Sequence, residues 1–123
     1  MPQEVKEGLG YVKNNVPKDA LILYPEENLL IYGERRIVWS SVSGKSNDGL
    51  SSFFCVSDIE EVGERLSANR ISHILIKKSR IYDDQKERHL GGYPKSFVEK
   101  IPYLKGWEKV FENSEMALWK RHP

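Results

Sequence analysis

The chain has 123 residues, within the usual size of one domain, and 39% of them are hydrophobic. A disordered chain would be poorer in apolar residues and more one-sided in charge, so we expect a folded protein with one core. The 19 basic residues nearly balance the 18 acidic ones, which leaves a formal net charge of +1. A nucleic-acid-binding domain usually carries a basic excess, so no nucleic acid is expected as a partner.

The single cysteine and the lack of long apolar runs bear on the compartment. Cys55 is the one cysteine, so an internal disulfide is excluded and the redox compartment stays open. No window approaches the ~20 apolar residues of a membrane span, and the start has no signal-peptide pattern. We expect residues 1–123 to be a soluble single domain, and Met1 fits either a native start or the boundary of a fragment of a larger membrane protein.

The first predicted elements are a helix over residues 3–15 and a strand over residues 19–24. Apolar residues recur at helical spacing in the helix, and Pro17 ends it. Gly8 and Gly10 weaken this helical pattern. The strand is a short apolar run, as in strands buried on both faces. The apolar stripe of the helix consists of Val5, Leu9, Val12 and Val16.

The next segment has one ambiguous element. Residues 28–32 fit a short helical turn with Asn28 as its cap and Gly33 as its exit, or else a strand. Residues 37–39 form a second β-prone run, and residues 40–52 are rich in Ser, Gly and Asn, which predicts a loop.

A helix followed by a buried strand is the clearest unit of the sequence. Ser57 and Glu60 match a capping box, so a helix is predicted to begin there and to run to about Asn69. Residues 72–77 then form another apolar run typical of a buried strand.

The last third predicts a long loop, a short helix and a hairpin. Residues 79–93 are polar and predict the loop. Pro94 suits the first turn of a helix that is interrupted by Pro102 and stopped by Gly106. Apolar and polar residues then alternate on both sides of residues 112–114, which predicts an antiparallel hairpin. The apolar stripe of the helix is Phe97, Val98, Ile101 and Leu104, and the hairpin strands are residues 107–111 and 115–120.

This order of elements predicts the fold class. Helices that alternate with short buried strands favour an α/β fold with a small, mostly parallel sheet flanked by helices. We expect a three-layer, Rossmann-like arrangement that the C-terminal antiparallel hairpin completes.

No catalytic or metal-binding constellation is found. Residues 44–46 have the Gly-Lys-Ser ending of a phosphate-binding loop, but Trp39 stands where that motif needs a glycine. His73, His89 and His122 are far apart, with no other ligand at metal spacing. We expect neither a metal nor a cofactor.

Two weaker signals are interpreted as structural. Asp83 and Asp84 fit a solvated acidic turn better than a divalent-ion site. Cys55 beside His73 would give a nucleophile and a base, but a lone cysteine in an apolar run is most often a core residue. No catalytic residue is predicted.

A ligand site is predicted where strands end. In open parallel sheets the binding crevice lies beyond the carboxyl ends of the strands, and aromatic, acidic and basic residues follow these strands. Such a mixture suits a sugar or a phosphate head group, although ordinary solvated strand ends have the same composition. The candidate ligand-binding residues are Glu26, Glu27, Tyr32, Arg35, Arg36, Lys78 and Arg80.

Five segments resemble a known family over nearly the whole chain. They are residues 16–20 (VPKDA), 30–36 (LIYGERR), 66–76 (LSANRISHILI), 107–113 (WEKVFEN) and 116–120 (MALWK). Together they resemble the soluble C-terminal domain of polytopic membrane glycosyltransferases of the dolichyl-phosphate-mannose protein mannosyltransferase type.

The resemblance implies a non-catalytic accessory domain on the extracytoplasmic face of the membrane. The parent enzymes move a sugar from a polyprenyl-phosphate carrier to an acceptor with acidic residues of membrane loops, and this chain has no counterpart of those loops. The implied partner is the transmembrane part of the same polypeptide, with the polyprenyl-phosphate sugar or the acceptor as further candidates. The alternative is a free-standing cytosolic α/β module that binds a small anion or a protein.

Overall fold

The computed structural model describes residues 3–24, 36–39, 58–68, 70–82 and 93–122. Its helices are α1 (Gln3–Asn15), α2 (Ile59–Ala68) and α3 (Lys95–Lys100), with 3₁₀ turns η3 (Lys78–Arg80) and η4 (Ile101–Tyr103). Its strands are β1 (Leu21–Tyr24), β2 (Arg36–Trp39), β3 (His73–Lys77), β4 (Ile81–Tyr82), β5 (Tyr93–Pro94), β6 (Trp107–Glu112) and β7 (Met116–Arg121).

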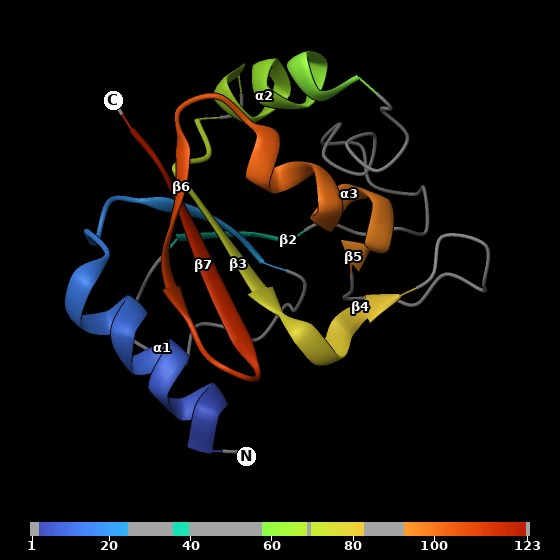
Figure 1. The fold of residues 1–123 in the computed structure, drawn as a ribbon. Helices are drawn as coiled ribbons and strands as arrows, with labels where there is room; N and C mark the ends of the chain where they lie inside the picture. Colours follow the sequence, from blue (N-terminus) through green and yellow to red (C-terminus); the bar gives the residue numbers. More distant parts are fainter. Residues whose placement is uncertain (1–2, 25–35, 40–57, 69, 83–92, 123) are drawn as a thin grey trace.

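Five of these strands form one sheet in the order β2-β1-β3-β7-β6. β1 pairs in parallel with both β2 and β3, whereas β7 is antiparallel to both β3 and β6. Four of the five strands therefore point the same way. Helix α1 covers one face, and α2 and α3 cover the other (Figure 1). The predicted three-layer α/β fold with a C-terminal hairpin is confirmed.

Helix α1 lies close to the sheet because one of its residues has no side chain. A Cβ atom at Gly8 would stand 2.7 Å from Met116 Cγ and 2.9 Å from Met116 Cβ, on β7. The glycine that weakened the helical pattern is thus a contact point. The core on this face consists of Val5, Leu9, Val12, Val16, Ala20, Ile22, Tyr24, Leu75, Met116 and Leu118.

Helix α2 has a cap at each end. Asp58 caps its start: Asp58 Oδ1 accepts a 2.9 Å hydrogen bond from the Glu60 amide. Ser57 lies outside the described residues, and the helix begins one residue later than a Ser57 cap implies. At the other end Ile71 N donates to Leu66 O at 3.0 Å and Arg70 N to Ser67 O at 2.9 Å. This is a Schellman motif with Arg70 in the left-handed conformation, at φ 58°.

The segment from residue 78 to residue 104 differs in part from the prediction. The expected loop of residues 79–93 begins with η3, and its flanks pair in parallel as β4 and β5. Pro94 lies in β5 and not in the first turn of a helix, since α3 begins at Lys95. The predicted interruption of this helix by Pro102 is confirmed, because the 3₁₀ turn η4 follows α3 directly. Gly106 has a φ of +81°. The expected elements at residues 28–32 and 40–52 lie outside the described residues.

The β6–β7 turn is closed by one asparagine. Asn113 Oδ1 accepts from the amides of Glu115 at 2.9 Å and Met116 at 2.8 Å. Its Nδ2 donates to Glu4 O at 2.8 Å, which attaches the turn to α1. The predicted hairpin is confirmed: β6 extends one residue further than predicted, and β7 begins and ends one residue later.

Substitution of the two glycines of α1 separates packing from helix propensity. We expect Gly10→Ala to raise the free energy of unfolding by up to about 1 kcal/mol, because nothing lies within 4 Å of the added Cβ. Gly8→Ala gains the same propensity but overpacks Met116, so we expect a net loss of about 1 to 2 kcal/mol. Urea denaturation of both variants checks this, and equal effects would contradict the close contact.

The left-handed residue after α2 gives a second stability prediction. A non-glycine residue in this conformation costs about 1 kcal/mol, so Arg70→Gly should raise the urea midpoint. Arg65→Gly in the interior of α2 is the matched control and should lower it, since glycine costs about 1 kcal/mol in a helix. A lower midpoint for both variants would contradict the Schellman assignment.

Candidate functional site

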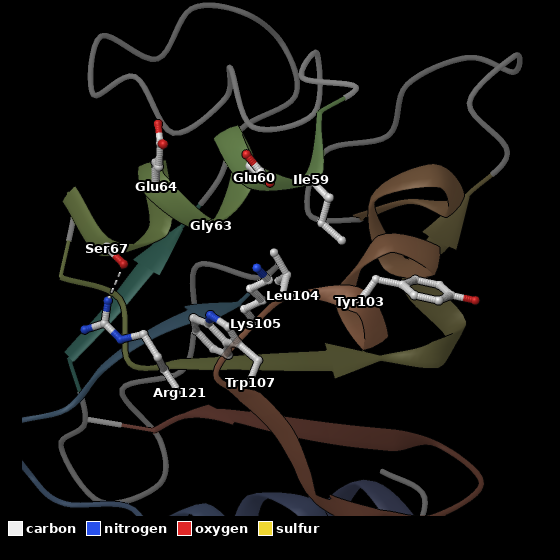
Figure 2. Close-up of a pocket in the computed structure, with 10 residues that line it drawn as sticks. All are labelled: Ile59, Glu60, Gly63, Glu64, Ser67, Tyr103, Leu104, Lys105, Trp107 and Arg121. Carbon is white, nitrogen blue, oxygen red and sulfur yellow. Dashed lines mark hydrogen bonds between the residues drawn. The ribbon is translucent and has the colours of Figure 1, made fainter.

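A groove lies between α2 and the segment that joins η4 to β6 (Figure 2). Its volume is about 660 Å³, within the range of small-molecule pockets. Residues 59, 60, 63, 64 and 67 form the α2 side, because they share one face of the helix. The complete lining is Ile59, Glu60, Gly63, Glu64, Ser67, Tyr103, Leu104, Lys105, Trp107 and Arg121.

The groove has an apolar floor and charged sides. Leu104 and Trp107 belong to the core that packs under α2, and both are nearly buried. At one end Arg121 Nη1 donates to Ser67 Oγ at 2.8 Å (Figure 2). That serine has a guanidinium as its neighbour, and a guanidinium cannot accept a proton. The Ser67–Arg121 contact therefore provides no general base for the serine hydroxyl.

The topology does not bring together all the residues predicted for ligand binding. Lys78 and Arg80 lie in η3, directly after the carboxyl end of β3. Arg36 begins β2 and pairs with Leu21, the first residue of β1, so it lies at the opposite, amino edge of the parallel strands. Glu26, Glu27, Tyr32 and Arg35 lie outside the described residues.

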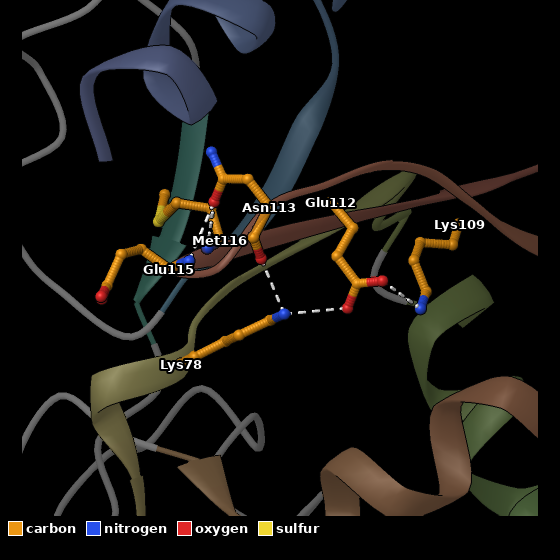
Figure 3. Close-up of polar contacts among 6 residues, drawn as sticks. All are labelled: Lys78, Lys109, Glu112, Asn113, Glu115 and Met116. Atoms are coloured by element: carbon orange, nitrogen blue, oxygen red, sulfur yellow. Dashed lines mark hydrogen bonds and ion pairs between the residues drawn. The ribbon is translucent and has the colours of Figure 1, made fainter. Parts of the chain in front are cut away.

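Lys78 is engaged at the β6–β7 turn (Figure 3). Its Nζ lies 3.0 Å from Glu112 Oε2 and donates to Asn113 O at 2.7 Å. Glu112 Oε1 accepts from Lys109 Nζ at 2.8 Å. Hydrogen bonds from Lys109 and then Lys78 lower the pKa of Glu112. In this arrangement the Lys78 ammonium holds the end of β3 against the hairpin.

The groove was missed because the strand-end argument selects the other edge of the sheet. Trp107 pairs with Arg121 and His73 pairs with Lys120, so the groove lies over the amino ends of the parallel strands. The sequence feature that could have indicated the groove is residues 103–107, where aromatic and basic side chains lie on both sides of the glycine that ends a predicted helix. Among the described residues, Tyr103 is a large hydrophobic side chain that is exposed to solvent, with 77% of its surface accessible.

His73 is a core residue, which was not predicted from the sequence. Its side chain is 4% exposed, and its Nδ1 lies 2.7 Å from Ser72 Oγ. Burial, and secondarily the charge of Lys120, lowers the pKa of His73 from 6.5 to about 4. Cys55 and His89 lie outside the described residues. Among the residues that the structure describes, no group of three His, Cys, Asp or Glu could hold a metal ion.

The buried histidine predicts how stability depends on pH. His73 binds a proton below about pH 4 when folded but below about pH 6.5 when unfolded, so acid favours the unfolded state. Between pH 7 and pH 4 we expect this group to remove on the order of 2 kcal/mol from the free energy of unfolding. His73→Leu should lack this component, whereas His122→Leu, at an exposed position, should keep it. Urea denaturation at several pH values measures it, and identical pH slopes for wild type and His73→Leu would contradict it.

Comparison with known proteins supports the fold. No protein-family model and no curated protein sequence matches the chain. The crystal structure of the C-terminal globular domain of an oligosaccharyltransferase from Archaeoglobus fulgidus is similar to it, with a TM-score of 0.67. The two chains are 14% identical, and the match covers 98% of each. No described helix has the length and apolar content that a membrane crossing needs. The chain thus has the fold of the C-terminal globular domain of an oligosaccharyltransferase, which is not the mannosyltransferase type that the sequence resemblance named.

Proposed function

We propose that this chain is a non-catalytic accessory domain of a membrane glycosyltransferase. One observation carries the proposal: the likeness to the globular domain of an oligosaccharyltransferase extends over 98% of both chains. A match of this extent accounts for the whole domain and not for a shared sheet motif alone. The sequence resemblance, made from separate segments along the chain, points to the same general class of parent enzyme.

The chemistry of the described residues agrees with an accessory role. The histidine of the sheet is buried and neutral at physiological pH, and the serine of the groove faces an arginine. Neither can act as an activated nucleophile or a general base as placed. Transfer of the sugar would then fall to the transmembrane part of the same polypeptide. We further propose that the domain lies on the extracytoplasmic face and that the donor is a polyprenyl-phosphate sugar.

Fractionation of the cells that encode the chain tests this proposal. An antibody against the 123-residue domain should detect a polypeptide far longer than 123 residues in the membrane fraction. Protease added to intact spheroplasts should remove the epitope, because the domain faces outward. A 123-residue band in the soluble fraction would contradict the proposal, and protection from protease would contradict the extracytoplasmic side.

Catalysis is tested on the purified chain. Incubation with a polyprenyl-phosphate-linked mannose and a peptide acceptor should give no glycosylated product. A cytosolic small-anion module would instead show saturable binding of inorganic phosphate, which we do not expect. Product formation by the chain alone would overturn its assignment as non-catalytic.

A further inference from the structure

The groove beside α2 is an open slot with an apolar floor. Its α2 side runs from Ile59 to Ser67, about 12 Å at 1.5 Å per residue. Gly63 stands in the middle, and a Cβ atom there would meet Leu104 Cδ2 at 3.7 Å, an ordinary contact. The helix and the η4–β6 segment therefore come near each other without closing the slot. Leu104 and Trp107 lie beneath it.

The charges around the slot cancel. Glu60 and Glu64 line the α2 side and Lys105 and Arg121 line the opposite side, so the lining holds two acidic and two basic side chains. The lining therefore has no formal charge excess that would favour an anion over a cation. Hydrogen-bond donors and acceptors line it together. Hydroxyl groups both donate and accept, so a neutral ligand with many hydroxyls suits this lining.

Tyr103 provides an aromatic surface at one end of the slot. Its side chain is 77% exposed and projects outward from η4 near Ile59 (Figure 2). Its backbone is held in place, because Ile101 and Leu104 on either side are buried in the core. A tyrosine ring offers a flat apolar face with a polar tip. A pyranose ring presents the matching features, which are a face of C–H groups and a rim of hydroxyls.

From these features we propose that the groove binds a neutral saccharide. The C–H face of one sugar ring lies on Tyr103, and the hydroxyls of the chain reach Glu60, Glu64 and Lys105. An amphipathic helix is a poorer occupant, because charges on both sides interrupt the apolar floor. This inference rests on the proposed function for its biological setting. The structural argument for it depends on the groove alone.

Titration of the whole 123-residue chain with mannotriose and with triacetylchitotriose tests the inference. Two-dimensional NMR should show saturable shifts at the Gly63 amide and the Trp107 indole N–H for at least one sugar, with a dissociation constant on the order of 1 mM. Glucose 1-phosphate and a neutral acceptor peptide serve as the anionic and protein probes. We expect neither to shift these signals more strongly than the neutral sugars do.

Variants separate stacking from general stability. Tyr103→Ala should weaken sugar binding roughly fivefold or more, and Tyr103→Phe should keep it, because the ring face remains. Tyr11→Ala is the matched control: Tyr11 stacks on Phe111 at 4.8 Å on the other side of the sheet, so its loss should leave binding unchanged. Gly63→Leu fills the slot and should abolish binding while its circular dichroism stays native.

Three results would overturn the inference. They are no saturable shift with either sugar, stronger groove shifts with the phosphate or the peptide, and equal binding by wild type and Tyr103→Ala. Failure here is distinct from failure of the accessory role, because cell fractionation does not depend on the groove. Conversely, a free-standing 123-residue protein in the cell would leave the sugar titration interpretable.

Discussion

Burial of the central sheet on both faces is the constraint on which the rest of the domain depends. Along β3, Ile74 and Ile76 point to the core under α2 and α3, and Leu75 points to the core under α1. On β7, Trp119 and Leu118 divide in the same way. Because side chains alternate with a period of two, a slip of one residue would exchange the two cores. Two apolar faces thus determine the register of the sheet and the positions of the helices that cover it.

The β6–β7 turn shows how polar contacts complete this arrangement. Asn113 closes the turn and also bonds to the backbone of α1, while Lys78 joins the end of β3 to the same turn. The ion pairs of Lys78 and Lys109 with Glu112 are exposed, and pairs of this kind contribute little energy. The hydrogen bonds from Asn113 to Glu4 O and from Lys78 to Asn113 O connect three elements that are distant in sequence. Lys78, a candidate ligand residue from its place after a strand, therefore also has a structural role.

The groove is a consequence of the same packing. Helix α2 covers the amino half of the sheet, and the turn of η4, stopped by Gly106, brings Tyr103 to its edge. A binding surface at this place does not follow the strand-end rule for parallel sheets, which concerns the opposite edge. The antiparallel hairpin makes the difference, because Trp107 and Arg121 are brought together only by the pairing of β6 with β7. A saccharide there would lie apart from the strand ends that carry Lys78.

The sequence by itself determined the elements whose patterns are local. Helical spacing and Pro17 placed α1 over residues 3–15, the apolar run placed β3, and alternation placed the hairpin. These patterns depend on neighbouring residues, so the fold class followed from them. Only the tertiary structure decided that Gly8 is a packing contact, that Arg36 lies away from Lys78, and that a groove forms beside α2. Each of these depends on which distant segments meet, and strand order and helix placement set that through the burial of the whole core.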